Sequence, residues 1–206
     1  MNENCPVIVM AKAPVAGFAK TRLIPALGAH GAAALAECLL ERAIGHALEA
    51  QLGPVDLCCT PDMSHPALAR HAAWHGMALS AQGDGDLGAR MARAFDRWLV
   101  RAGRALMTGT DAPALDAAML VRAAAALDEA DAVFIPALDG GYALIGLRRA
   151  APRRTATGGR CRRTCRPGAP AARLAFLPRF AMTAAGDGDT AGPSHSNPCQ
   201  SNIATP

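Results

Sequence analysis

Short apolar segments alternate with longer helical patterns along the first 150 residues of the chain. The apolar segments predict buried strands at residues 6–11, 55–59, 77–81, 105–107, 131–137 and 143–147. Between them, apolar residues recur at helical spacing and predict helices at residues 32–50, 67–75, 87–99 and 114–129. Strands that alternate with helices are typical of a three-layer α/β/α protein, in which a mostly parallel sheet carries helices on both faces.

A carboxylate follows the predicted strand 105–107. The chain leaves this strand at Gly109, presents Thr110 and Asp111, and reaches Pro113 just before the predicted helix 114–129, which Pro113 would begin. Open α/β sheets bind ligands at the carboxyl ends of their strands, so Asp111 is a candidate ligand for a metal ion that holds a phosphate. The alternative is that Asp111 only caps the helix.

A cationic loop follows the first predicted strand. Residues 12–22 contain Lys12, Lys20 and Arg22, no acidic residue, and Pro14 and Gly17 as breakers of regular structure. Lysine and arginine at the end of a strand suit a diphosphate, because lysine offers a point charge and arginine a two-pronged donor. The alternative is a solvated basic loop.

Two further segments contain glycine-rich turns. Residues 83–88 match the spacing of a dinucleotide fingerprint, but Asp84 and Asp86 would face the pyrophosphate and the segment does not follow the first strand, so we reject that interpretation. The first turn of the next helix could still bring backbone N–H groups and Arg90 to a substrate. Asp139-Gly-Gly is a tight turn that either approaches a ligand or simply closes a hairpin.

Histidine and cysteine give weaker signals. His71 and His75 stand one turn apart in the predicted helix 67–75, but no third ligand is evident nearby, which favours a surface helix over a metal site. Seven cysteines show no disulfide framework. A zinc site formed by Cys161, Cys165, His195 and Cys199 is a remote alternative.

Composition and charge exclude several classes of protein. Hydrophobic residues make up 51% of the 206 residues, enough for one folded core, and only 4% are aromatic. The N-terminus lacks the basic start of a signal peptide, and the apolar run 6–11 is too short to span a membrane, so we expect a cytoplasmic protein. Residues 1–150 carry a net charge of −2 and residues 151–206 one of +6, so the basic balance does not predict nucleic-acid binding by the folded part.

The last 56 residues differ from the rest of the chain. They contain eight Arg, seven Pro and six Gly, with no Lys or Glu and no sustained apolar period, although residues 173–178 resemble a strand. We therefore divide the chain into a domain at 1–150 and a divergent, poorly ordered tail at 151–206. An out-of-frame translation of a GC-rich gene is an alternative origin for this tail.

Four segments, in order along the chain, carry a resemblance to a known family. They are residues 11–23, 85–91, 109–115 and 139–147. The chain resembles a bacterial family of small GT-A-fold glycosyltransferase-like proteins, associated with radical-SAM or arsenosugar-biosynthesis genes. These proteins are distant relatives of nucleotide-diphospho-sugar transferases and of 2-phospholactate guanylyltransferase.

The resemblance implies a nucleotide-diphospho-sugar transferase (GT-A, Rossmann-like) fold with a nucleotide lying over the strand ends. It places eight residues near the nucleotide or its phosphates: Ala11, Lys12, Gly17, Lys20, Arg22, Asp86, Gly88 and Arg90. Asp111 would hold Mg²⁺ or Mn²⁺ against the diphosphate, and Asp111 and Asp139 would be the catalytic residues. Gly140, Gly141 and Tyr142 would face the sugar or the acceptor.

The tail departs from the family pattern. The family continues with a helix and an Asp-x-Asp-Thr-Pro segment, which residues 187–190 only echo, so Asp189 is a further candidate metal ligand. The expected function is a metal-dependent glycosyltransferase that uses a nucleotide-diphosphate sugar and a small-molecule acceptor. A nucleotidyltransferase that releases pyrophosphate from a nucleoside triphosphate and an inactive nucleotide-binding remnant are the alternatives.

Overall fold

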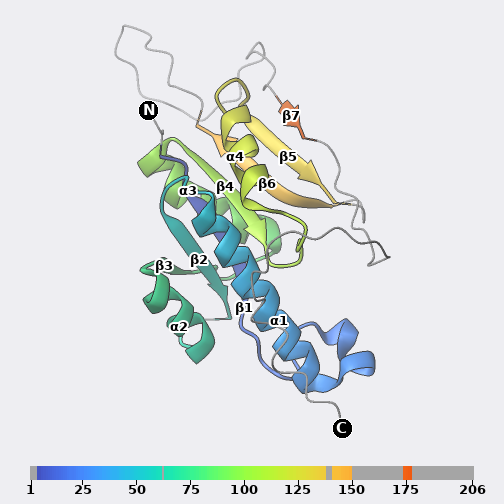
Figure 1. Ribbon diagram of the computed structural model, residues 1–206. Coiled ribbons are helices and arrows are strands. Elements are labelled where there is room, and N and C mark those ends of the chain that lie inside the picture. Colours follow the sequence, from blue (N-terminus) through green and yellow to red (C-terminus); the bar gives the residue numbers. More distant parts are fainter. Residues whose placement is uncertain (1–3, 62, 138–140, 150–173, 178–206) are drawn as a thin grey trace, which may run out of the picture.

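The computed structural model describes residues 4–61, 63–137, 141–149 and 174–177. These residues form a seven-stranded sheet in the order β3-β2-β1-β4-β6-β5-β7 (Figure 1). The strands are β1 (Val7–Lys12), β2 (Val55–Thr60), β3 (Ala78–Ala81), β4 (Arg104–Gly109), β5 (Ala132–Pro136), β6 (Tyr142–Arg148) and β7 (Leu174–Phe176). Only β6 runs antiparallel to its neighbours within this sheet, which confirms the prediction of a mostly parallel arrangement.

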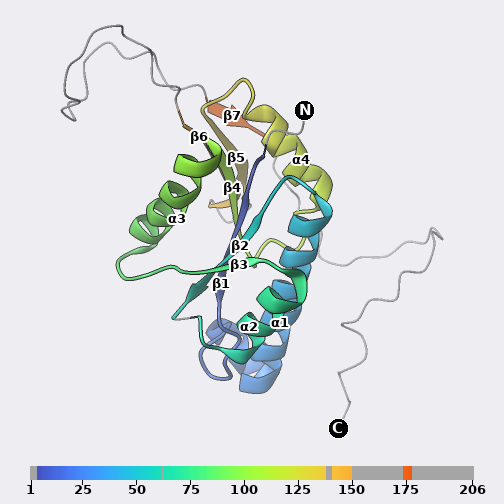
Figure 2. The same ribbon diagram turned by 90° about the vertical axis from the view of Figure 1, so that its left-hand side faces the viewer.

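Helices cover both faces of the sheet. Figure 2 shows α3 (Leu87–Ala102) on one face, and α1 (Ile24–Glu49), α2 (Pro66–His75) and α4 (Ala117–Ala126) on the other. Side chains of β1 point alternately to the two faces of the sheet and contribute to a hydrophobic core on each. Val7 and Val9 pack with the α1 and α4 side chains, whereas Ile8 packs with Phe95 of α3. Because both faces are buried, the strands are nearly continuous apolar runs, as the sequence shows.

The chain reverses its direction of travel across the sheet between β1 and β4. From β1 it moves outward through β2 to β3, and it then returns to add β4 on the other side of β1. The register pairs Val7 with Val55 of β2 and with Leu106 of β4. The carboxyl ends of β1 and β4 therefore lie side by side at a topological switch point, where open α/β sheets form ligand crevices.

Helix α1 is longer than predicted. It begins at Ile24, not at residue 32, and contains a non-helical residue, Gly28, with φ 69° and ψ 168°. The segment Thr21–Glu49 is long and apolar enough, by length and composition alone, to cross a membrane. Only 11% of its most apolar window is buried. The buried side chains of α1 recur every three or four residues: Ala32, Ala36, Leu40, Ile44 and Ala47. Leu40, Ile44 and Ala47 among them belong to the core on this face of the sheet.

Helix α4 is shorter than predicted. The sequence placed its start at Ala114 after Pro113, but the helix begins at Ala117, because the Asp116 carboxylate accepts a hydrogen bond from the Met119 N–H at 2.8 Å. The preceding residues form a turn closed by the Leu115 N–H and the Ala112 carbonyl. Pro113 therefore lies in this turn and is not the first helical residue.

Two further expectations concern the histidines of α2 and the residues after position 150. The prediction of a surface position holds for His75, which is exposed, and is wrong for His71, which is buried on the face of α2 that meets α1. Residues 174–176 form β7, which pairs in parallel with β5, so the sheet includes residues from both sides of position 150. The division of the chain at 150 and the alternative zinc site remain predictions, because Cys161, Cys165, His195, Cys199 and most of the tail lie outside the described residues.

Candidate functional site

The cationic loop after β1 folds back on itself. The Lys12 ammonium donates a hydrogen bond to the Phe18 carbonyl at 2.7 Å, and the Ala19 N–H donates to the Val15 carbonyl at 2.9 Å. Lys20 then adopts a left-handed conformation, with φ 47° and ψ 43°, immediately before the short 3-10 helix Thr21–Leu23. Left-handed backbone is unfavourable for a lysine, and strained residues of this kind cluster at binding sites.

The turn after β4 presents Asp111 to solvent. Its side chain is 77% exposed, and its Oδ1 accepts a hydrogen bond from the Thr110 hydroxyl at 3.1 Å. The helix that follows is capped by Asp116 and not by Asp111. The interpretation of Asp111 as a helix cap is therefore wrong, and its carboxylate is available to other partners.

One such partner is Lys20. The Lys20 ammonium forms an ion pair with Asp111 Oδ1, although the two residues are 91 positions apart in sequence. The Lys20 side chain is only 18% exposed. This ion pair joins the two segments that the sequence singled out at the ends of β1 and β4.

The two segments line one open pocket of about 500 Å³. Among the described residues, its lining contains the cations Lys12, Lys20 and Arg22 and one carboxylate, that of Asp111. These described lining residues carry a net positive charge, three cations against one anion, which suits a diphosphate or triphosphate. The remaining lining residues are Phe18, Ala19, Thr21, Leu23, Ala36 and Thr110.

Sequence reasoning missed Phe18 as a site residue. Its ring is 67% exposed at the pocket, an unusual position for a large apolar side chain. The signal was present in the sequence, because Phe18 is the one aromatic residue between Lys12 and Arg22. Such an exposed ring next to cations offers a flat surface for a nucleobase.

The other predicted phosphate-binding residues have different positions. Ala11 is buried within β1, and Gly17 adopts a φ of 85° in the cationic loop. Asp86 caps α3 by accepting a hydrogen bond from the Ala89 N–H at 2.8 Å. Gly88 and Arg90 follow in the first turn of α3, and neither lines the 500 Å³ pocket.

Arg90 is directed back toward its own loop. Its Nε lies 3.3 Å from the Asp86 carbonyl, and a terminal nitrogen lies 3.4 Å from Gln82 Oε1. Gln82 is buried, and its amide donates to the carbonyls of Ala11 and Cys58 at 3.1 and 3.0 Å. The loop before α3 is thus anchored to the carboxyl-terminal halves of β1 and β2, beside the pocket.

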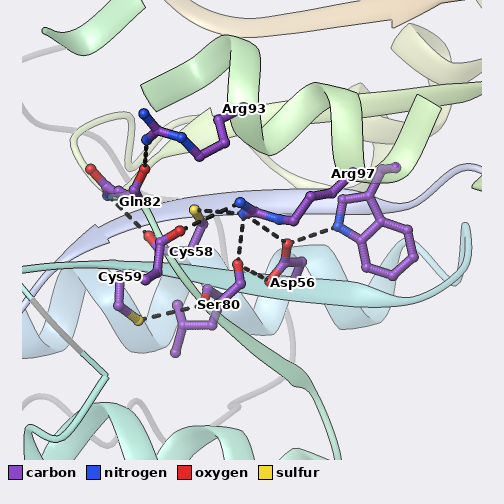
Figure 3. A network of polar contacts seen from close by, with 10 residues as sticks. Asp56, Cys58, Cys59, Ser80, Gln82, Arg93 and Arg97 are labelled. Carbon is purple, nitrogen blue, oxygen red and sulfur yellow. Dashed lines mark hydrogen bonds and ion pairs between the residues drawn. The ribbon is translucent and has the colours of Figure 1, made fainter. Parts of the chain in front are cut away.

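A polar network continues from Gln82 beneath α3 (Figure 3). Arg93 donates hydrogen bonds to the Gln82 and Asp84 carbonyls, which secures the loop from the helix side. Deeper in the protein, Asp56 of β2 is 1% exposed and receives hydrogen bonds from Ser80 and Trp98. The Arg93 bonds thus hold the loop before α3, whereas the Asp56–Trp98 bond holds the C-terminal half of α3 on β2.

The predicted residues around the Asp-Gly-Gly turn are only partly within the described chain. Asp139, Gly140 and Asp189 lie outside it. Tyr142 begins β6 and is half exposed, with its ring edge-on to Phe134 at a centroid distance of 6.1 Å. The Gly141 carbonyl accepts a hydrogen bond from the Ala137 N–H, which joins the ends of β5 and β6 at the same sheet edge as Asp111.

Solved structures share this architecture. The crystal structure of a proposed nucleotide-diphospho-sugar transferase from Desulfovibrio desulfuricans G20 matches with a TM-score of 0.64 and 28% identity, over 71% of this chain and 64% of that one. The present chain thus spans less than two thirds of that protein. A 4-diphosphocytidyl-2C-methyl-D-erythritol synthase from Anaerococcus prevotii DSM 20548 matches with a TM-score of 0.50 and 9% identity, over 72% of each chain, which shows the fold alone.

These matches confirm the expected nucleotide-diphospho-sugar transferase fold. No curated protein sequence matches the chain. The sequence profile of one family matches residues 43–157, more than half of the chain, and this span contains three of the four segments that carry the resemblance. The chain belongs to this family, described as uncharacterized proteins conserved in bacteria (DUF2064).

Proposed function

We propose that this protein is a metal-dependent glycosyltransferase that binds a nucleotide-diphosphate sugar in the pocket at the ends of β1 and β4. The observation that carries the proposal is the meeting of Lys20 and Asp111 in a pocket that also contains Lys12 and Arg22. A metal–diphosphate complex would satisfy both groups: the metal ion would bind the Asp111 carboxylate, and the diphosphate would bind the Lys20 ammonium. The likeness to a proposed nucleotide-diphospho-sugar transferase supports the same substrate class.

The residues of the pocket fit Mg²⁺ or Mn²⁺. Both ions prefer oxygen ligands, and Mg²⁺ in particular often uses one or two carboxylates and completes its shell with substrate phosphates and water. Asp111 offers such an oxygen at an exposed position, next to the Thr110 hydroxyl. When bound, the ion would neutralise negative charge on the departing nucleoside diphosphate.

The protein's own groups would perform the remaining tasks. Lys12, Lys20 and Arg22 would hold the phosphates, and the hydrogen bond from Lys12 to the Phe18 carbonyl keeps the loop closed around them. A charge-assisted hydrogen bond is worth roughly 1.5–3 kcal/mol, so loss of the Arg22 guanidinium should weaken nucleotide binding by about ten- to a hundredfold. Phe18 would pack against the base or ribose, because its ring is exposed at the pocket.

The opposite side of the crevice would receive the acceptor. We assign Asp139 as a second catalytic carboxylate, and Gly140, Gly141 and Tyr142 as the segment that faces the sugar or acceptor. The position of Tyr142 at the start of β6, on the same edge as Asp111, supports this assignment. Asp86, Gly88 and Arg90 would approach the nucleotide from the α3 side, and Asp189 would add a second metal ligand.

We also propose a cytoplasmic location for the protein and a divergent tail after residue 150.

One alternative has support from the pocket itself. Three cations would hold a nucleoside triphosphate as well as a diphosphate, so a nucleotidyltransferase that releases pyrophosphate uses the same residues. The two reactions differ in their products, because glycosyl transfer releases a nucleoside diphosphate. An inactive remnant would bind nucleotide and release neither product.

A thermal-shift screen tests the proposal first. The purified chain is melted with nucleoside diphosphates, nucleoside triphosphates and nucleotide sugars, each with and without Mn²⁺. A ligand at a hundredfold excess over its dissociation constant stabilises a protein by about 2.7 kcal/mol, which is readily measured. We expect a metal-dependent shift with nucleotide sugars that is lost in Asp111→Ala and reduced in Lys20→Ala.

The matched control is Glu129→Gln, an exposed carboxylate beyond the end of α4 and outside the pocket. It should retain the full shift. If no nucleotide stabilises a cooperatively melting protein, or if Asp111→Ala binds as the wild type does, the proposed site is wrong. Release of pyrophosphate from a triphosphate, with no diphosphate from nucleotide sugars, would establish the alternative reaction.

A further inference from the structure

Three potential metal ligands meet between α1 and α2, apart from the pocket. Glu37 and Glu41 stand one turn apart on α1, and His71 faces them from α2. One ligand atom from each of the three residues lies within 4.8 Å of the other two, and His71 Nε2 is 3.9 Å from Glu41 Oε1. None of the three side chains lines the 500 Å³ pocket.

His71 is the unusual member of this cluster. The residue is only 7% exposed, and among the described residues its buried Nε2 has no hydrogen-bond partner. Buried polar atoms in native proteins are nearly always satisfied by protein, water or an ion. The unpartnered nitrogen is directed toward two carboxylates, which are the groups that would surround a cation together with it.

An ion pair between His71 and Glu41 does not explain the arrangement. Burial lowers the pKa of the His71 imidazole, and this effect outweighs the opposing attraction of Glu41. The neutral imidazole is the form that ligates metal ions. The 3.9 Å separation is too long for a direct hydrogen bond.

Arg70 completes the surroundings of the cluster. Its guanidinium donates a hydrogen bond to Glu37 Oε1 from the solvent side of α2. A carboxylate has two oxygens, so Glu37 can ligate through one while Arg70 holds the other. Hydrogen bonds of this kind orient the carboxylate ligands of many metal sites.

We infer that Glu37, Glu41 and His71 form a binding site for a divalent transition-metal ion, with Zn²⁺ as its best-matched probe. One imidazole nitrogen and two carboxylate oxygens are borderline donors that suit Zn²⁺ or Co²⁺ better than Mg²⁺ or Ca²⁺, which prefer shells of oxygen alone. Three protein ligands leave a fourth position of a tetrahedron for water.

The three side chains need to move little to bind an ion. Ligand atoms about 2.0–2.1 Å from Zn²⁺ lie roughly 3.4 Å apart in a tetrahedron, so the present separations must shorten by about 1.5 Å at most. Both glutamate side chains are partly exposed on a helix surface, so a small rotation would bring an oxygen of each toward the ion. The bound ion would fasten α2 to α1, in addition to the ion pair between Arg70 and Glu37.

Metal content of the intact chain provides the test. The protein is stripped with EDTA, and Zn²⁺ binding is titrated by calorimetry for the wild type and for the double variant Glu37→Gln, Glu41→Gln. These amide side chains keep the size of both residues, so the variant should melt as the wild type does in EDTA. We expect the double variant to bind one equivalent less of Zn²⁺, and its melting temperature to lose the increase that Zn²⁺ gives the wild type.

Two controls separate this site from others. His75→Asn removes an exposed histidine one turn further along α2 and should retain the equivalent. Asp111→Ala should also retain it, because Asp111 belongs to the other pocket. His71→Asn should lose it, and Co²⁺ bound by the wild type should give the visible spectrum of a nitrogen- and oxygen-ligated tetrahedral ion. Equal stoichiometry in the wild type and the double variant would overturn the inference.

Discussion

Replacement of Asp56 by alanine should lower the free energy of unfolding more than most single substitutions do. Asp56 lies in β2, the second strand from the edge of the sheet, and it is 1% exposed. Its Oδ1 accepts a hydrogen bond from the Ser80 hydroxyl at 2.7 Å, and its Oδ2 accepts one from the Trp98 indole at 2.7 Å. The Arg97 guanidinium lies 3.7 Å from Oδ2 and donates to Ser80 Oγ at 2.8 Å (Figure 3).

The magnitude follows from what the substitution leaves behind. Truncation removes the acceptor of two short hydrogen bonds, each worth roughly 1.5–3 kcal/mol because the acceptor is charged. It also leaves Arg97, which is itself mostly buried, without its counter-ion. Breaking a buried ion pair from one side typically costs about 3–5 kcal/mol, and we expect Asp56→Ala to fall in this range.

Urea unfolding followed by tryptophan fluorescence and by circular dichroism measures the cost. Ser80→Ala should cost about 1 kcal/mol, because it removes one hydroxyl and leaves the carboxylate paired with Trp98 and Arg97. Asp96→Ala, an exposed aspartate on the same helix as Trp98, is the matched control and should lie within about 0.5 kcal/mol of the wild type. A cost for Asp56→Ala no larger than that of the control would refute the network as a stabilising element.

Three further predictions concern the sheet, the cationic loop and a buried thiol. Gly146→Ala should cost about 1–3 kcal/mol in urea unfolding, because a Cβ there would lie 2.4 Å from a Val133 methyl and 2.7 Å from a Leu106 methyl; an unchanged midpoint would contradict this packing. Lys20→Gly should be more stable than Lys20→Ala by about 1 kcal/mol, since glycine alone adopts φ 47° without strain; equal stabilities would argue against the left-handed backbone. Burial raises the pKa of the Cys5 thiol to about 11, so iodoacetamide at pH 8 should label Cys5 in unfolded but not in folded protein, as peptide mass mapping would show.

The sheet and its helices could be predicted from the sequence because their pattern is local. The first strand needed only its run of apolar residues, and the amphipathic face of α3 needed only the spacing of Phe95 and its neighbours. Strand order was not local information. Antiparallel β6 lies between β4 and β5, where Gly146 packs closely against Val133 and Leu106, and no period in the sequence reveals this contact.

The sequence predicted the individual residues of the candidate site but not which residues from distant segments meet. Lys20 stood out as a cation in a loop without acids, but its partner Asp111 is 91 residues away. The ligands that face His71 likewise come from α1 and not from His75 on its own helix. Asp56 gave a signal that could have been used, because a carboxylate inside an apolar strand must be paired when that strand is buried.

The two aspartates on either side of Pro113 show how the structure assigns roles that the sequence leaves open. Asp111 and Asp116 both precede the helix, and either could cap it by residue type alone. The buried side chain of Leu115 and the turn closed by its N–H set the helix start at Ala117, so only Asp116 reaches the Met119 N–H. Because one carboxylate satisfies the helix, the other remains at the end of β4, where it pairs with Lys20 across the pocket. Asp111 also accepts a hydrogen bond from the Thr110 hydroxyl, and it can exchange Lys20 for a metal ion when a phosphate takes the ammonium. The proposed metal-dependent nucleotide binding at this sheet edge requires this exchange.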